Sequence, residues 1–168
     1  MKISKIVGDA SKKERSLQKI RGIINYQFLS KIGNILFPRD VKLIYSRKTG
    51  KIKYIYLNGK LLATYRPQDG LFSLTIYGAN KIHACLKQRN KIIVKKNVEE
   101  FVKNGKSVFA RHVVVADKEV RPGSEVIVTD ANDGLLAVGK ALLSGKEILA
   151  FKRGVAVKVR KGLQEELG

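Results

Sequence analysis

Residues 103–111, KNGKSVFAR, and 152–160, KRGVAVKVR, hold the side chains of this chain that could do chemistry. In the first segment Gly105 lets the backbone approach a phosphate without interference from a Cβ atom, and Ser107 can donate a hydrogen bond. The cations of the two segments are Lys103, Lys106, Arg111, Lys152, Arg153, Lys158 and Arg160. Cations beside a close backbone approach favour contact with the sugar-phosphate edge of a nucleic acid.

Both segments also have a structural explanation that needs no ligand. A glycine after lysines is typical of a helix C-terminus, so residues 103–105 could simply end a helix. In the second segment Val155, Val157 and Val159 alternate with other residues, which is the period of a half-buried strand. Lysines on an edge strand deter pairing with other chains. These segments alone leave both interpretations open.

No group of residues in the sequence meets the requirements of acid–base or nucleophilic catalysis. We interpret His83 as a surface or packing residue, and His112 as a strand residue whose protonation Arg111 disfavours. We expect Cys85 to be a small buried hydrophobe and Asp69 to form a turn. A single cysteine excludes an internal disulfide and a cysteine-rich zinc site. We therefore expect no metal, no cofactor and no small-molecule substrate.

The charge balance narrows the class of partner. The 168 residues include 34 Lys and Arg against 14 Asp and Glu, a net charge of +20, which attracts polyanions. No stretch approaches the roughly 20 apolar residues that a spanning helix needs, and we see no signal peptide, so we expect a cytoplasmic protein. Residues 1–90 hold 19 of the cations and 4 of the acids, which indicates two modules with different surfaces.

The first half has the pattern of an α+β module. Residues 9–29 predict a helix capped by Asp9 or Ser11. Four strands are then predicted, joined by the turns RKTG, NG and PQDG, and Asn58-Gly59 is a strong hairpin signal. The expected strands are 41–46, 51–57, 60–66 and 71–76. Because the turns are short, we expect an antiparallel meander, followed by a short helix over 77–88.

A second group of cations surrounds the first hairpin turn of this module. It consists of Arg47, Lys48, Lys51 and Lys53, and Lys42 and Arg66 could extend it. A solvated loop and a nucleic-acid contact explain this group equally well.

The second half has the pattern of a small closed or half-closed β-barrel. We expect strands at 91–96, 107–117, 124–130, 135–144 and 155–160, with short helices at 98–106 and 145–151. Many short strands punctuated by glycine are typical of such barrels. Phe109 could be core or a platform for a base, and we favour core.

Residues 91–162 resemble a PUA domain, a small RNA-binding barrel, through GKSVFARHVV, VRPGSEVIV, LLAVGKALLS, EILAFKRGVAVKVR and the spacing between them. The resemblance implies a mixed β-barrel in which the helix–strand junction at 103–111 contacts RNA. Residues 152–160 would then form the opposite wall of the same groove. We accordingly divide the chain into a pre-PUA α+β module, 1–90, and a PUA domain, 91–168.

The first module resembles the segment that precedes the PUA domain in archaeal tRNA-guanine transglycosylases. The similarity lies in NYQF, LFP and the long run SRKTGKIKYIYLNGKLLATYRPQDGLFSLTIYGA. That family inserts the archaeosine precursor into the tRNA D-arm, and a related tail occurs in archaeosine synthase. The family usually has aspartate and glycine where this chain has Asn25 and Leu29. The family's large catalytic barrel and cysteine-rich zinc site have no counterpart in these 168 residues.

The resemblance implies a non-catalytic tRNA-binding accessory subunit that grips the acceptor stem through its PUA domain. Its partner would be a separate transglycosylase or archaeosine synthase chain. Tyr54, Tyr56 and Phe72 could form the docking surface, although interior faces of the sheet explain the same residues. A ribosome-biogenesis or translation protein is the alternative from another class. A compact RNA-modifying enzyme is a third, and it would need a cofactor pocket that the sequence does not show.

Overall fold

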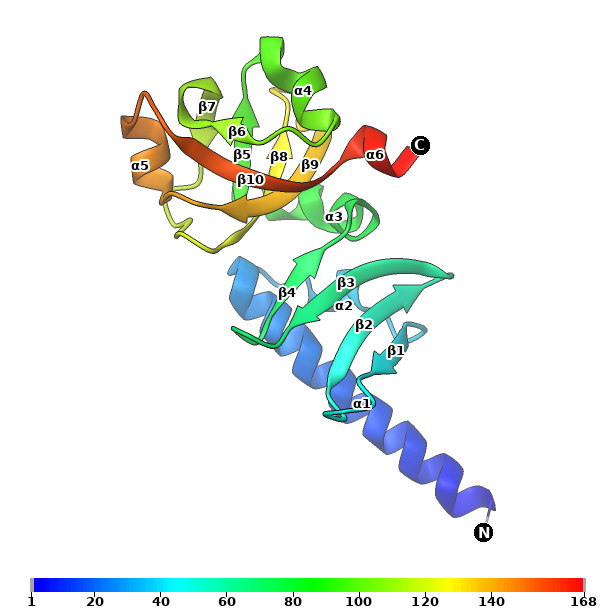
Figure 1. Cartoon of the computed structure of the whole chain (residues 1–168). Coiled ribbons are helices and arrows are strands. Elements are labelled where there is room, and N and C mark those ends of the chain that lie inside the picture. The colour runs from blue at the N-terminus through cyan, green and yellow to red at the C-terminus, as the bar shows by residue number, and fades with distance from the viewer. Residues whose placement is uncertain (1, 168) are drawn as a thin grey trace.

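The computed structural model describes residues 2–167, with side chains described from Ala10 onward. The first half forms a four-stranded sheet with helices (Figure 1). Its elements are α1 (Lys2–Phe28), α2 (Gly33–Leu36), β1 (Lys42–Tyr45), β2 (Ile52–Leu57), β3 (Lys60–Arg66), β4 (Leu71–Leu74), α3 (Ile76–Ile82) and a 3₁₀ turn, His83–Leu86.

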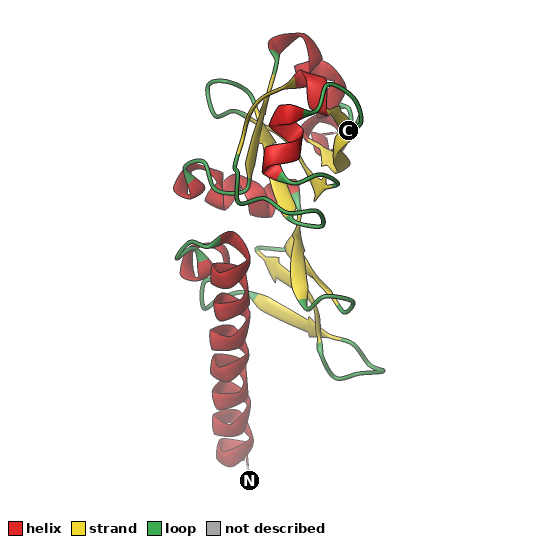
Figure 2. Cartoon of the chain, turned by 90° about the vertical axis from the view of Figure 1, so that its left-hand side faces the viewer, coloured by secondary structure: helices red, strands yellow, loops and turns green. Residues whose placement is uncertain are grey.

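Helix α1 starts earlier than the sequence pattern predicts. It begins at Lys2, so Asp9 and Ser11 lie inside the helix and the capping prediction is wrong. No proline stands in this stretch to stop the helix from extending toward the N-terminus. Its apolar face is buried as expected, and α1 runs along one side of the sheet (Figure 2). That face consists of Leu17, Ile20, Ile24 and Phe28.

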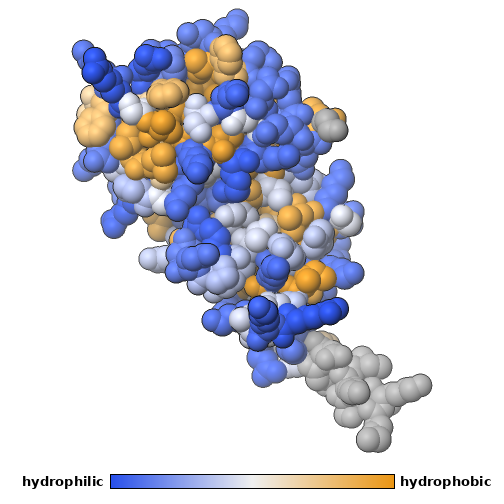
Figure 3. All heavy atoms as spheres, viewed as in Figure 1, coloured by the Kyte–Doolittle hydropathy of each residue, from blue (hydrophilic) through white to orange (hydrophobic). Residues whose placement is uncertain are grey.

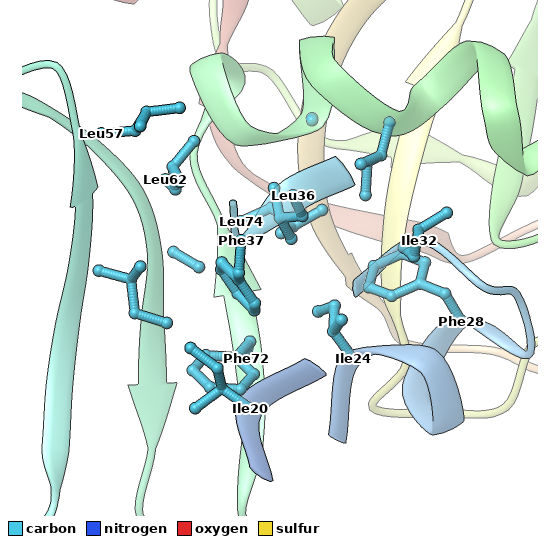
Figure 4. Close-up of a cluster of buried hydrophobic side chains, with 14 of the residues drawn as sticks. Ile20, Ile24, Phe28, Ile32, Leu36, Phe37, Leu57, Leu62, Phe72 and Leu74 are labelled. Atoms are coloured by element: carbon cyan, nitrogen blue, oxygen red, sulfur yellow. The ribbon is translucent and has the colours of Figure 1, made fainter. Parts of the chain in front are cut away.

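The antiparallel meander is confirmed, with strand order β1–β2–β3–β4. Asn58 and Gly59 both adopt positive φ, 51° and 75°, as the hairpin between β2 and β3 requires. The core between α1 and the sheet is aromatic and aliphatic, and the Phe37 and Phe72 rings lie 5.5 Å apart within it (Figure 4). This packing holds the sheet rigidly on the helix.

The second half forms a six-stranded sheet that curls into a nearly closed barrel, in the order β6–β10–β9–β8–β5–β7. Strands β5 and β8 pair in parallel and the other pairs are antiparallel, so the barrel is mixed as predicted. Its elements are β5 (Lys91–Val94), a 3₁₀ turn Lys96–Val98, α4 (Glu99–Lys103), β6 (Val108–Phe109), a 3₁₀ turn Ala110–His112, β7 (Val113–Ala116), β8 (Glu125–Thr129), β9 (Leu135–Ala141), α5 (Gly145–Ala150), β10 (Val155–Gly162) and α6 (Leu163–Leu167).

The single strand predicted at 107–117 is wrong. Two edge strands, β6 and β7, replace it, and His112 lies in the 3₁₀ turn between them. The turn carries the chain from one edge of the sheet to the other. On one side Ala110 N donates to the Gly154 carbonyl at 2.9 Å, and on the other the His112 carbonyl accepts from Lys95 N at 2.9 Å. Closing the barrel therefore forces the break.

A buried carboxylate and an arginine of the barrel bind each other where the barrel meets the first half. The Glu125 side chain on β8 is fully buried, and its Oε1 lies 2.6 Å from Nη2 of Arg160 on β10. The same nitrogen donates to the Leu74 carbonyl of β4 at 2.7 Å. Burial raises the pKa of the Glu125 carboxyl, and the positive charges of Arg160 and Arg66 oppose that rise. Ile127 and Val138 of the barrel also join the core of the first half.

We predict that Arg160→Met destabilises the protein by about 2–3 kcal/mol at pH 7, because it leaves a buried carboxylate without its partner. Urea unfolding measures the effect. The matched control is Lys158→Met on the same strand, an exposed cation with no ion pair among the described residues. Equal losses in the two variants would contradict the prediction.

The same variant should have a distinctive pH dependence. A carboxyl whose folded-state pKa is raised contributes stability below its unfolded pKa, and this contribution is lost as the pH rises through the folded pKa. Removing Arg160 raises the pKa of Glu125 further, so the deficit of Arg160→Met should shrink as the pH falls toward 4.5. Unfolding free energies from pH 4.5 to 7.5 test this, and a constant deficit would assign the loss to packing.

Candidate nucleic-acid interface

The helix–strand junction at residues 103–107 is built by a glycine turn. Helix α4 ends at Lys103, and Gly105 follows with φ of +85°. Gly105 N donates to the Val102 carbonyl at 2.9 Å and Lys106 N to the Phe101 carbonyl at 3.0 Å, so the last carbonyls of the helix are satisfied. The turn then directs the chain into β6 with Lys106 exposed.

Pairing of β6 with β10 brings the two sequence segments together. Val155 pairs with Phe109, and Val157 pairs with Val108. Residues 106–111 therefore lie beside residues 153–157, although nearly fifty residues separate them in the chain. The exposed cations near this pair are Lys106, Arg111, Lys152 and Arg153. Lys158 is exposed farther along β10, opposite Lys140 of β9.

A cavity of about 460 Å³ opens next to this strand pair. Two exposed phenylalanines line it, Phe101 at 62% and Phe109 at 43% exposure. The prediction that Phe109 belongs to the core is wrong, because strand alternation turns Val108 inward and Phe109 outward. The space-filling view also shows a hydrophobic patch on the barrel beside α5, a helix that contributes no residue to the lining of this cavity (Figure 3).

Arg111 and His112 both contact the Phe109 ring. The Arg111 guanidinium lies over the Phe109 ring, 5.7 Å from its centroid, and the His112 ring meets it edge-on at 6.5 Å. Burial, followed by the charges of Arg111 and Lys95, lowers the pKa of His112. Arg111 Nε donates to His112 Nε2 at 3.3 Å, which fits a neutral ring. Exposed aromatic rings can stack on a nucleobase, and cations beside them can bind its phosphate.

Two predicted cations are engaged elsewhere. Lys103 Nζ lies 3.0 Å from Glu100 Oε1, and this hydrogen bond raises the pKa of Lys103. Arg160 lies at the junction with the first half, bound to Glu125 and to the Leu74 carbonyl. The cations along β10 therefore have two roles. Those near its start are exposed beside β6, whereas Arg160 near its end holds the junction with the first half.

The second cation group lies on the turn between β1 and β2. Its members, Arg47, Lys48, Lys51 and Lys53, are all exposed. Lys42 is exposed as well, but Arg66 is 15% exposed and its Nη2 lies 2.9 Å from Asp69 Oδ2, so it does not extend the group. Asp69 forms the turn as expected, because its carboxylate accepts from Leu71 N at 3.0 Å.

The structure corrects two further expectations. Phe72 is fully buried against Phe37 and Tyr65, so it cannot form the docking surface suggested with Tyr54 and Tyr56, which are half-buried. Cys85 is exposed, because the 3₁₀ turn His83–Leu86 directs Leu86 into the core and leaves the cysteine outside. His83 is half-buried, with Nδ1 3.3 Å from the Asn80 carbonyl.

Two other kinds of site are not found in the part of the chain that the structure describes. Among the side chains that the structure describes, from Ala10 to Leu167, no cluster of histidine, cysteine, aspartate and glutamate could hold a metal ion. Within residues 2–167 no helix combines the length and apolar composition that crossing a membrane requires. Phe101 is not among the predicted site residues, although it is exposed and lines the cavity beside Phe109. The next residue, Val102, is buried, and a helix turns by about 100° per residue, so a core-facing Val102 leaves Phe101 toward solvent.

Comparison with known proteins places both halves in families. The family model for the patch-forming domain C2 of tRNA-guanine transglycosylase matches residues 18–89, and the PUA domain model matches residues 90–163. The chain is similar to the tRNA-guanine(15) transglycosylase of Methanobrevibacter smithii, with 41% identity over 89% of this chain and 23% of the relative. The corresponding protein of Thermococcus kodakarensis is 43% identical over 87% of this chain and 25% of the relative.

Solved structures share the fold. A hypothetical protein from Pyrococcus horikoshii OT3 superposes with a TM-score of 0.72 at 22% identity, covering 91% of this chain and 93% of that one. A conserved PUA domain protein from Thermoplasma acidophilum gives 0.62 at 22% identity, covering 92% and 93%. This chain spans about a quarter of the curated relatives. It therefore consists of a C2 domain of the tRNA-guanine transglycosylase type followed by a PUA domain.

Proposed function

We propose that this chain is a tRNA-binding accessory subunit in archaeosine tRNA modification, and that it grips the acceptor stem through its PUA domain. The observation that carries the proposal is the pairing of β6 with β10. It sets Lys106 and Arg111 beside Arg153, next to two exposed phenylalanines. Duplex RNA is recognised through its phosphates, 2′-hydroxyls and shape, and unpaired bases stack on aromatic rings.

The cations beside β6 and β10 would bind RNA by charge and shape, and a second basic surface would contact the same tRNA elsewhere. The exposed hairpin cations Arg47, Lys48, Lys51 and Lys53 form a separate basic surface on the first half. A tRNA that touches both surfaces would be held at two points of a rigid body. Neutralising about six phosphates makes binding fall about a thousandfold between 50 and 200 mM salt. The net charge of +20 supports such salt dependence.

The chain contributes binding, and a separate transglycosylase or archaeosine synthase polypeptide breaks and forms the bonds. The matched region is about a quarter of each transglycosylase relative. Tethering tRNA near that partner raises its effective concentration at the catalytic site. We also propose that the chain divides into modules 1–90 and 91–168 and that it is located in the cytoplasm. The two family matches meet at residues 89 and 90, which supports the division.

We predict that Lys106→Glu combined with Arg153→Glu weakens tRNA binding at least tenfold and lowers the salt slope by about two, because two phosphate contacts are lost. Filter binding from 50 to 200 mM salt measures both. The matched control, Arg89→Glu with Lys118→Glu, makes the same charge change at a different cavity. Equal losses in the two double variants would remove Lys106 and Arg153 from the site.

We also predict a role for the exposed phenylalanines that line the cavity, Phe101 and Phe109. Phe109→Ala should weaken binding of a duplex with an unpaired 3′ end about tenfold and leave binding of a blunt duplex unchanged, because only the former offers a base to stack. Phe151→Ala is the matched control, since Phe151 is similarly exposed, at 47%, and does not line the cavity. Identical effects on the two RNAs would assign Phe109 to backbone contact or folding.

The accessory role is tested by incubating the purified chain with unmodified tRNA and analysing nucleosides by mass spectrometry. We expect unchanged nucleosides from the chain alone, and capture of a transglycosylase or archaeosine synthase on the native protein. Co-sedimentation with ribosomal particles alone would favour the ribosome-biogenesis alternative. Turnover of a base by the chain alone would overturn the accessory role.

A further inference from the structure

The position above Gly105 is already occupied by an acidic side chain. A Cβ atom built on Gly105 would lie 2.6 Å from Oε1 and 2.7 Å from Oε2 of Glu165. The carboxylate therefore rests directly on the bare Cα of Gly105. Its Oε2 also accepts a hydrogen bond from Gly162 N at 2.6 Å. This is the side of the backbone on which the absence of a Cβ would otherwise admit a phosphate.

Gly105 and Gly162 together form the site that the Glu165 carboxylate occupies, which we call the seat. Gly162 ends β10, and a Cβ atom there would clash with the Lys103 carbonyl and lie 2.7 Å from Gly105 N. The end of β10 and the turn after α4 consequently approach backbone to backbone. The seat between them offers a bare Cα and an N–H donor, with Lys106 nearby in the sequence. A phosphate oxygen needs the same donor geometry that the carboxylate oxygen uses here.

The segment that brings the carboxylate is weakly held. Helix α6 has five residues, none of them buried. Leu163 packs in part against the core of the first half, and Gln164 Nε2 donates to Glu100 Oε2 at 3.3 Å in an exposed hydrogen bond. Segments with few buried apolar contacts open at low free-energy cost. Glu166 follows on the same helix and is exposed, so α6 carries two neighbouring acids, of which Glu165 lies against Gly105.

We propose that Glu165 is a built-in competitor for an RNA phosphate at Gly105, and that RNA displaces its carboxylate on binding. The inference rests on the proposed function, since it concerns the same proposed RNA-binding surface. Small anions make one contact and do not displace a carboxylate that is hydrogen-bonded in place. A folded RNA that also engages Lys106 and Arg153 gains enough contacts to do so. Glu165 thereby sets specificity for extended polyanions.

Substitution separates this role from that of a helix cap. Glu165 is the third residue of α6 and accepts from Gly162, the residue before the helix, which is half of a capping box. Glu165→Gln keeps an oxygen acceptor for Gly162 N and removes the charge, whereas Glu165→Ala empties the seat. Glu166→Gln and Glu166→Ala are matched controls that remove the same charge one residue along.

We expect tRNA binding to tighten about three- to tenfold in Glu165→Gln and further in Glu165→Ala, because a charge-assisted hydrogen bond no longer competes. The Glu166 variants should change affinity less than twofold. In the unsubstituted protein the amide resonance of Gly162 should shift as tRNA reaches saturation, because its acceptor changes. A Gly162 resonance that stays in place at saturation would overturn the proposal, as would equal affinities of the Glu165 and Glu166 variants.

The outcome is distinguishable from failure of the proposed function. If Lys106→Glu with Arg153→Glu weakens binding and the Glu165 variants match the Glu166 controls, RNA uses the groove without displacing the carboxylate. If Lys106→Glu with Arg153→Glu binds tRNA as the unsubstituted protein does, the groove itself is not the RNA site.

Discussion

Burying the Glu125 carboxylate between the two halves is the constraint on which the arrangement of this molecule depends. A buried charge needs a partner, and Arg160 supplies one while also donating to the Leu74 carbonyl of the first sheet. One guanidinium therefore satisfies groups from both halves of the chain. Apolar packing of Ile127 and Val138 into the first core buries area without fixing an orientation. The hydrogen bond from Arg160 to the Leu74 carbonyl is directional, and it links β10 to β4.

Strand β10 connects that junction to the groove. Its first residues pair with β6 beside the exposed cations, and Arg160 near its end binds Glu125. Its last residue, Gly162, packs against the turn that carries Gly105. Because one strand takes part in all of these contacts, the groove is held at a fixed angle to the first half. The hairpin cations of the first half consequently present a second basic surface at a fixed distance from the groove.

The regular elements were predictable because their signals are local. Asn58-Gly59 dictates a hairpin whatever lies around it, and the helical spacing of Leu17, Ile20 and Ile24 identifies a buried face. The break between β6 and β7 at Ala110–His112 could not be predicted, because it arises only from closure of the barrel. The role of Arg160 was equally hidden, because its partner Glu125 is 35 residues away and its charge resembles that of Lys158.

The groove combines features that a purely electrostatic surface does not need. Cations alone would bind any polyanion, with affinity governed by salt. Exposing Phe101 and Phe109 to water is unfavourable for folding, and a carboxylate over Gly105 weakens the positive potential where it is wanted most. Both features become useful only if the ligand offers a base to stack and enough phosphates to displace an acid. Structured RNA with an unpaired end satisfies both conditions, which is why charge excess alone describes this surface incompletely.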